Sequence, residues 1–494
     1  MSSKRMSSLL SGGSSPSPKK QKQKLQEQQQ QQELSRRTEQ INLLTDGVGI
    51  QPFIKMHQYG PDNDDCELIY IQGSLHADEL PGIMVNHHLL RLLDITDKIG
   101  SSSRGGNHIL KRIHIVPYAN PFGLNQTILH DVQGRFNIAT GTNFNRNFAN
   151  TTKNLIKNGI YDKLKTANSN SNSNNSNGNS NNNSNSNSDS DNNYDEIAKF
   201  NTEIVRQEII IELNNLMNNT GITSEEHYKL QLLIRACKAN IVLDLHCDSH
   251  ALMHMYTHTA LWTDTNTDTD TDHCIMKTLA CELQASPVQL ATLDSACCFD
   301  DICSGVYYEL HNHASNTGDD KKPILMGCAS ATVELRGELD VSDETAFNDA
   351  CAIYRFLQRQ GYIASGVGVG VGAGTDEVVV TDNVKGNEFH ALKVLEMLST
   401  NIRSVSLPSL PREAASLEAT DMIKATAGGI INWNCELGDE VKTGDILGEI
   451  INVEVRESPF PFLSFHCIPL YCIAVYCIAL LPLLLLLLLN SSQC

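Results

Sequence analysis

The chain has 494 residues, which is enough for two to three domains. A formal net charge of -19 and a pI of about 5.3 leave no basic surface that could neutralise phosphates, so a nucleic-acid partner is excluded. The 15 cysteines contain no Cys-x-x-Cys unit, and the polar, basic N-terminus lacks the apolar core of a signal peptide. These features predict reduced thiols and a cytoplasmic location.

Residues 1–40 are rich in Ser, Lys and Gln and are predicted to be disordered, because they have too little apolar content to fold alone. The next region, 50–365, alternates short apolar runs with amphipathic segments. Strands are predicted at 68–71, 113–116, 241–245, 252–256 and 331–335, and helices at 83–93, 197–217, 225–237 and 344–360. Strands separated by helices indicate an α/β domain with a largely parallel or mixed sheet.

Three low-complexity tracts interrupt this pattern. Residues 168–193 are almost purely Asn and Ser, residues 263–272 repeat Thr and Asp, and a Gly-rich linker covers 366–376. Such tracts cannot pack into a core, so we predict that they lie on surface loops.

The loop between the first predicted strand and helix carries His76 and Glu79, three positions apart. One imidazole and one carboxylate at this spacing can bind a single metal ion from one turn. Zinc sites that keep a position open for water need three protein ligands, commonly two histidines and one carboxylate. His-x-x-Glu alone is a common pattern, so the motif depends on a third ligand elsewhere in the chain.

We predict His246 as that third ligand, because it ends a buried-strand pattern in a place where α/β sheets form ligand sites. Asp244 projects to the same face of the strand and could orient the imidazole. A buried histidine bonded to backbone is the alternative. His254 and His258 compete as ligands, but one lies within a predicted strand and the other beyond it.

Further charged residues complete a candidate site. Arg146 beside Asn145 is suited to grip a carboxylate, and Arg135 offers a second cation. Glu334 stands in an otherwise apolar strand, where a carboxylate is costly unless it is paired or functional. A salt bridge to Arg336 is the alternative role for Glu334.

The candidate residues follow one another in a characteristic order: His76 and Glu79, then Asn145 and Arg146, then His246, then Glu334. This order resembles that of the zinc carboxypeptidase clan, and more closely its succinylglutamate desuccinylase/aspartoacylase branch, over residues 67–365. This resemblance implies a carboxypeptidase-like mixed sheet flanked by helices. It also implies one zinc ion per chain held by His76, Glu79 and His246, a substrate carboxylate held by Asn145 and Arg146, and Glu334 as the general base. One departure is Asn143, which stands where many relatives have an aspartate that supports the first zinc-bound histidine; a neutral amide raises the basicity of that histidine less.

The C-terminal region resembles a different module. Residues 377–457 contain short β runs separated by Gly-Asp turns, similar to the first half of a biotinyl/lipoyl-like barrel, and this small β domain is predicted to be truncated. An apolar tail follows at 458–494. Its uncharged stretch 467–489 is long enough to span a bilayer, so the tail is either a membrane anchor or a gene-model artefact.

We therefore predict a zinc-dependent amidohydrolase that removes the acyl group from N-acyl amino acids. Glu334 would take a proton from zinc-activated water, and Arg135 would help to stabilise the oxyanion. The nearest alternative is a metallocarboxypeptidase that cuts peptide C-termini. A lipoyl or biotinyl carrier is disfavoured because no Met-Lys or Asp-Lys hairpin is present, and an inactive, membrane-tethered binding relative is the remaining alternative.

Overall fold

The structure is a computed structural model that describes most of the chain in eleven segments. These segments are 36–45, 51–102, 108–167, 188–262, 274–292, 297–319, 321–366, 388–417, 430–442, 444–451 and 462–466.

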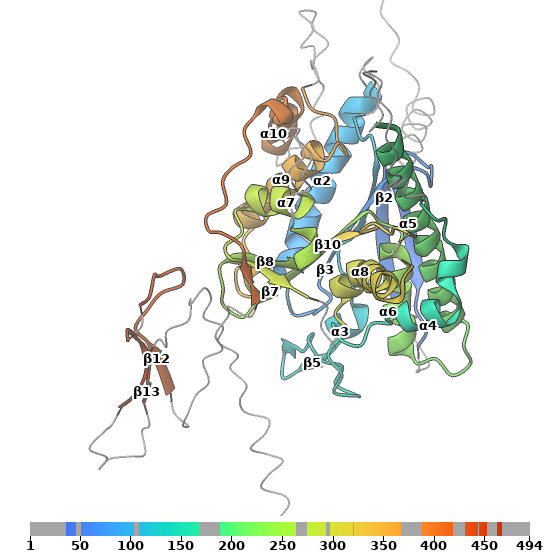
Figure 1. The fold of residues 1–494 in the computed structure, drawn as a ribbon. Helices are drawn as coiled ribbons and strands as arrows, with labels where there is room; N and C mark the ends of the chain where they lie inside the picture. The colour runs from blue at the N-terminus through green and yellow to red at the C-terminus, as the bar shows by residue number, and fades with distance from the viewer. Residues whose placement is uncertain are drawn as a thin grey trace, which may run out of the picture.

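A nine-stranded sheet lies at the centre of the molecule (Figure 1). Its strands are β1 (Arg37–Asn42), β2 (Phe53–Tyr59), β3 (Leu68–Gly73), β4 (Arg112–Val116), β7 (Ile241–Asp248), β8 (Met253–His258), β9 (Val288–Ala291), β10 (Ala329–Gly337) and β11 (Ala415–Ser416). They are arranged in the order β1-β2-β4-β3-β7-β10-β8-β9-β11. The central strands β4, β3, β7 and β10 are parallel, whereas the pairs β1–β2, β2–β4 and β8–β10 are antiparallel. Strand β9 pairs in parallel with both β8 and β11. The prediction of a mixed α/β sheet is confirmed.

Helices cover both faces of this sheet (Figure 1). One layer consists of α2 (Pro81–Ser102), α7 (Ile275–Leu283), α9 (Asp343–Arg359) and α10 (Glu388–Ser399). The other consists of α4 (Thr152–Lys157), α5 (Ser188–Met217), α6 (Ser224–Ala236) and α8 (Phe299–Thr317). The short elements are α3 (Pro121–Leu124), the hairpin strands β5 (Thr127–Ile128) and β6 (Asp131–Val132), and the 3-10 helices η1 (Ile160–Lys163), η2 (Thr259–Leu261) and η3 (Ile402–Ser404).

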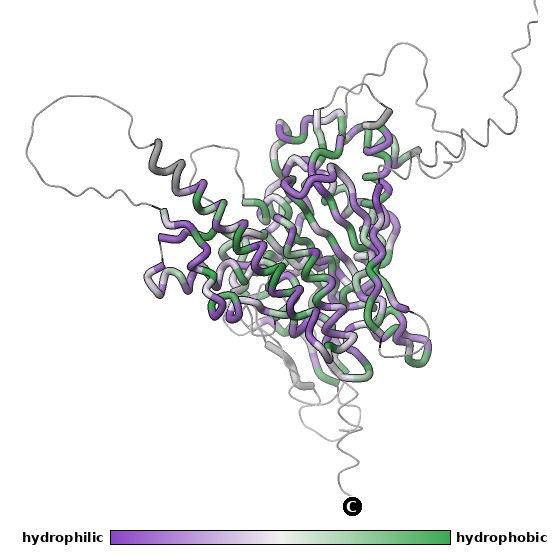
Figure 2. Tube along the Cα trace, turned by 90° about the vertical axis from the view of Figure 1, so that its right-hand side faces the viewer, coloured by the Kyte–Doolittle hydropathy of each residue, from purple (hydrophilic) through white to green (hydrophobic). Residues whose placement is uncertain are grey.

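The sequence pattern of each layer follows from this arrangement. All six residues of β3 are buried, because helices cover the sheet on both sides. Along the helices that face the viewer in Figure 2, hydrophilic and hydrophobic residues alternate, as expected for helices that place one face on a sheet. Two apolar cores result, one on each side of the sheet.

Every predicted strand and helix is present, with shifted ends, but the sheet extends beyond the predicted boundaries 50–365. Strand β1 precedes residue 50, and β11 follows residue 365. Strand β1 is mostly polar and partly exposed, because it is an edge strand, so it carries little apolar signal. Residues 168–187 of the Asn/Ser-rich tract lie outside the described segments. Its last residues, from Ser188, already belong to α5 and not to a loop. The 263–272 tract and most of the 366–376 linker also lie outside them.

A separate three-stranded antiparallel sheet contains β12 (Ile430–Trp433), β13 (Ile446–Ile451) and β14 (Phe462–His466). The predicted β domain 377–457 is not purely β, because it also contains helix α10. The predicted tail 458–494 contributes a strand, because β14 pairs with β13. No helix in the described part of the chain has the length and apolar content needed to cross a bilayer. The stretch 467–489 lies outside that part.

Candidate active site

The candidate site begins at a tight loop between β3 and α2. Ser74 has a φ of 60°, which turns the chain sharply at the carboxyl end of β3. The Glu79 amide donates to the His76 carbonyl at 3.2 Å, so both side chains emerge from one turn. Each of these residues is only 3% exposed. Strands β3 and β7 are parallel neighbours, so the carboxyl end of β7 brings His246 to the same edge.

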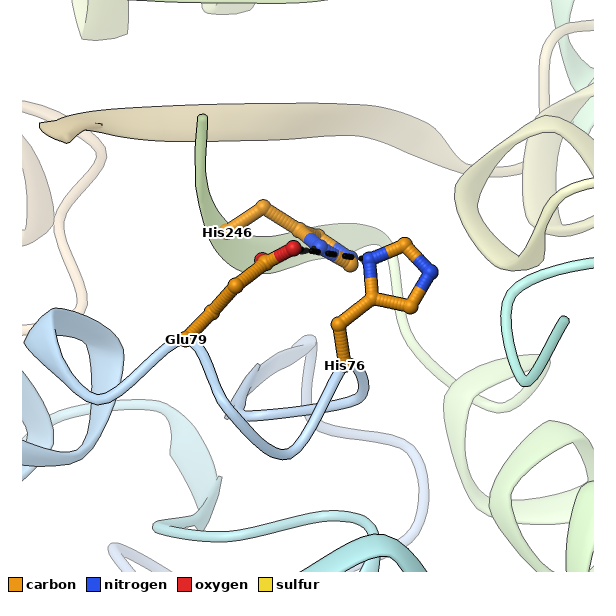
Figure 3. A group of neighbouring side chains, drawn as sticks. All are labelled: His76, Glu79 and His246. Atoms are coloured by element: carbon orange, nitrogen blue, oxygen red, sulfur yellow. Dashed lines mark hydrogen bonds and ion pairs between the residues drawn. The ribbon is translucent and has the colours of Figure 1, made fainter. Parts of the chain in front are cut away.

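The structure brings His76, Glu79 and His246 together (Figure 3), and the Glu79 carboxylate contacts both imidazoles. His76 Nδ1 lies 2.8 Å from Glu79 Oε1, and His246 Nδ1 lies 2.8 Å from Glu79 Oε2. One ligand atom from each residue falls within 4.8 Å of the other two. Two imidazole nitrogens and a carboxylate oxygen that converge in this way match the donor set of an open zinc site.

The outer nitrogens of both imidazoles are also held, as is usual for metal-binding histidines. His76 Nε2 lies 2.9 Å from Asn143 Oδ1, and His246 Nε2 lies 3.0 Å from Asp244 Oδ2. An amide oxygen can only accept a hydrogen bond, so His76 Nε2 donates to Asn143 and Nδ1 is the ring nitrogen that faces Glu79. The arrangement fits zinc, and Asn143 fills the supporting position despite its lack of charge.

A buried chain of hydrogen bonds behind His246 was not predicted from the sequence. Gln72 donates to Asp244 Oδ1 at 3.0 Å, and the Tyr70 hydroxyl donates to Gln72 at 3.0 Å. Both residues are fully buried in β3. The one signal available in the sequence was a glutamine at the end of an apolar strand.

Charge in the site is balanced locally. Burial raises the pKa of Glu79, but His246 and His76 lower it more strongly, so that its pKa lies well below the ordinary glutamate value. Burial lowers the pKa of His246, and the neighbouring carboxylates of Asp244 and Glu79 overcome this effect and raise it. Glu79 is therefore ionised and available as an anionic ligand.

Glu334 lies beside this group on β10. Its strand register places it opposite His246 on one side and His254 on the other. Its Oε2 atom is buried and has no hydrogen-bond partner among the described residues. Arg336, the alternative partner, instead makes a two-pronged salt bridge to Asp349 at 2.8 and 2.9 Å. Burial raises the pKa of Glu334 well above the ordinary glutamate value.

Arg135 reaches the site from the loop after the β5–β6 hairpin. Its Nη1 lies 3.2 Å from Glu79 Oε1 and 3.4 Å from His76 Nδ1, while its side chain stays 47% exposed. Gly134 permits this approach, because a Cβ there would lie 2.0 Å from the backbone nitrogen of Asp78. Arg135 thus contacts the same donor atoms that would hold a metal, and it must withdraw from them when a metal binds.

The predicted pair Asn145 and Arg146 divides between two environments. Asn145 is buried; its Oδ1 accepts from the Phe299 amide at 2.9 Å, and its Nδ2 lies 3.5 Å from His246 Nε2. Arg146 is half-buried, bonds its own neighbour Asn145 through Nη1, and makes no salt bridge within the described segments. Arg146 therefore still has guanidinium N–H groups that can donate to a substrate, whereas the Asn145 side chain is held inside the protein.

The two competing histidines do not join the first group. His258 Nδ1 accepts from the Ala260 amide at 3.1 Å and caps η2. His254 belongs to a second group with Asp248 and Glu334, whose ligand atoms also lie within 4.8 Å of one another. The sequence alone did not reveal this second group.

An open α/β sheet with two histidines and a carboxylate at its carboxyl edge defines a metallohydrolase class of protein. A family model described as zinc carboxypeptidase matches residues 54–347, more than half of the chain, and the chain belongs to this family. No curated protein matches the sequence.

Solved structures show the same fold. A protein from Shewanella frigidimarina NCIMB 400, described as a succinylglutamate desuccinylase/aspartoacylase, is 17% identical with a TM-score of 0.60 over 89% of this chain and 94% of that one. A succinylglutamate desuccinylase/aspartoacylase family protein from Shewanella amazonensis SB2B is 18% identical with a TM-score of 0.58 over 88% and 92%. The predicted resemblance to this branch is confirmed at the level of the fold.

Proposed function

We propose that the protein is a zinc-dependent deacylase that hydrolyses the amide bond of N-acyl amino acids. The observation that carries this proposal is the convergence of His76, Glu79 and His246 beside Glu334, whose Oε2 atom is buried. Family membership supports zinc chemistry and hydrolysis in general. The substrate class rests on the residues around the group.

His76, Glu79 and His246 would hold the zinc ion. When bound, zinc acidifies water to a pKa of about 7 and polarises a carbonyl. Glu334 accepts the proton of the attacking water and passes it to the departing amine as the C–N bond breaks. Arg135, freed from Glu79, can face the oxygen that gains negative charge. The products are a carboxylic acid and a free amino acid.

Arg146 would select the substrate by its carboxylate. A guanidinium that binds a carboxylate through two hydrogen bonds contributes about 1.5–3 kcal/mol. Arg146→Ala should therefore lower kcat/KM by roughly tenfold to a few hundredfold for the free acid and leave the zinc content unchanged. Arg146→Lys should recover only part of this loss, because an ammonium cannot match the planar fork.

The experiment compares an N-acyl amino acid with its amidated form, after metal analysis of the purified protein. Wild type should strongly prefer the acid, and Arg146→Ala should lose that preference. If wild type and Arg146→Ala each gave the same kcat/KM for the two substrates, the role of Arg146 would be refuted. A zinc content that is unchanged in His246→Ala would refute the ligand assignment.

A metallocarboxypeptidase is the second candidate, because the matching family model is that of zinc carboxypeptidases. A peptide C-terminus also carries a carboxylate next to an amide bond. N-blocked dipeptides with bulky and with small acyl groups are added to the same substrate panel, in order to separate the two activities. A higher kcat/KM for peptides than for simple N-acyl amino acids would favour the carboxypeptidase.

A further inference from the structure

A second group of metal-binding side chains lies next to the proposed zinc site. It consists of Asp248 at the end of β7, His254 on β8 and Glu334 on β10. Strand register sets His246, Glu334 and His254 in one row across β7, β10 and β8. Glu334 is therefore the member of the second group that lies next to the first.

The hydrogen bonding of His254 fixes which nitrogen faces this group. His254 Nδ1 lies 2.8 Å from the Leu252 carbonyl oxygen. A carbonyl can only accept, so Nδ1 carries the proton, and Nε2 is the atom that faces Asp248 Oδ2 at 3.5 Å. An imidazole whose other nitrogen donates to a backbone carbonyl is the arrangement typical of metal-binding histidines.

Glu334 supplies a second, independent observation. Its Oε2 is buried without a hydrogen-bond partner in the described part of the chain, and Arg336 is committed to Asp349. The Nε2 atom of His254 and one oxygen of each carboxylate thus converge within 4.8 Å of one another. Converging acceptors of this kind are stabilised by a cation, and one nitrogen with two carboxylate oxygens is a donor set that zinc accepts.

We propose that Asp248, His254 and Glu334 form a second divalent-cation site that regulates the first. Binding of a cation there engages the Glu334 carboxylate, which can then no longer accept a proton from water. The regulatory consequence rests on the proposed function, whereas the site itself does not. The site should be the weaker of the two, because Asp248 is half-exposed and Arg135 competes electrostatically for the same carboxylates.

Zinc stoichiometry tests the site without any substrate. The full-length protein, stripped of metal, is titrated with zinc by equilibrium dialysis and metal analysis. Wild type should bind two equivalents, and His254→Asn and Asp248→Asn should each weaken the second by at least about tenfold while keeping the first. His246→Ala should lose the tighter equivalent. His250→Asn is the matched control, since His250 is an exposed neighbour outside the group.

Turnover of an N-acyl amino acid tests the regulation. Wild type should be most active at one equivalent of zinc and fall about tenfold when free zinc reaches ten times the half-saturation of the second site. The turnover of His254→Asn, relative to its own value at one equivalent, should stay constant over that range.

The proposed site would be overturned if wild type were saturated at one equivalent of zinc. It would also be overturned if His250→Asn lost the second equivalent while His254→Asn and Asp248→Asn kept it. A protein that binds two equivalents but hydrolyses nothing at one equivalent would instead refute the proposed function and leave the second site established. The two failures are therefore distinguishable.

Discussion

At the scale of single residues, the candidate site depends on which atom of each side chain is free. Asn143 and Asp244 occupy the outer nitrogens of the two imidazoles, so both Nδ1 atoms face Glu79. Glu334 is the nearby carboxylate whose Oε2 has no hydrogen-bond partner within the described segments. A buried acceptor without a donor is costly to stability, which indicates that Glu334 is retained for its function.

Replacement of Glu334 tests this reasoning. Glu334→Gln should keep the tightly bound zinc and lower kcat by about 10²–10⁴-fold, because the amide is nearly isosteric but cannot accept the proton of water. Steady-state kinetics and metal analysis on the same preparation provide the measurement. Glu338→Gln, which removes a half-buried carboxylate just after the end of β10, is the control and should retain most turnover. Near-normal kcat in Glu334→Gln would place the base elsewhere.

At the scale of elements, helix α6 supports both arginine-bearing loops. The Lys229 ammonium is buried and donates to the Arg146 carbonyl at 2.9 Å and to Glu225 Oε1 at 2.7 Å. Glu225 Oε2 in turn accepts from Asn137, two residues after Arg135, at 2.9 Å. A capping box at Thr223 and Glu226 fixes the first turn of the helix from which Glu225 extends. The position of Arg146 therefore depends on α6.

Lys229→Met should loosen the Arg146 loop, because the thioether side chain fills the space but donates no hydrogen bond. Loss of a charge-assisted hydrogen bond of about 1.5–3 kcal/mol predicts a roughly tenfold or greater rise in KM for the free-acid substrate. KM for the amidated substrate and the zinc content should change little. A variant that raises KM equally for both substrates would indicate a general loss of structure and not a role in positioning Arg146.

At the scale of the whole molecule, buried histidines couple stability to pH. Burial, together with Arg36, lowers the pKa of His57 to about 4, and burial together with Arg112 lowers that of His114 to about 4. They lie on the neighbouring antiparallel strands β2 and β4. In the unfolded chain histidine has a pKa of about 6.5. Below that pH the unfolded state therefore binds more protons than the folded state, and stability is lost as the pH falls from 6.5 to 4.

We expect the melting temperature to fall steadily from pH 7 to pH 5 and to rise little between pH 7 and pH 8. His57→Gln combined with His114→Gln should flatten part of this dependence, because glutamine does not titrate. His130→Gln removes an exposed histidine and serves as the matched control, which should keep the wild-type slope. An unchanged slope in the double variant would show that these two groups do not carry the effect. Measurements on metal-free protein keep the zinc ligands out of the comparison.

Local patterns in the sequence were enough to predict the central part of the fold. Strands β3 and β7 begin with apolar runs because they are buried on both faces, and such runs can be read without a structure. Strand β10 alternates Ala, Val and Leu with polar residues, which is also a readable strand pattern. Four strands of the sheet, β1, β2, β9 and β11, were not predicted, and neither were helices α7, α8 and α10. Strands β1 and β11 lie at the two edges of the sheet, where strands bury few side chains. Strand β14 was missed because it lies within a stretch whose apolar composition indicated a tail.

For the site, the sequence by itself determined the pair that shares one turn, His76 and Glu79, since the two residues are three positions apart on one loop. It also placed His246 at a strand end. Only the tertiary structure decided which residues of different strands come into contact. The parallel register of β3, β7 and β10, with β8 antiparallel to β10, joins His246 to Glu79, puts Glu334 between two histidines and assembles Asp248 with His254. The physical reason is that strand pairing brings residues far apart in the chain within a few ångströms, and no local pattern encodes that register.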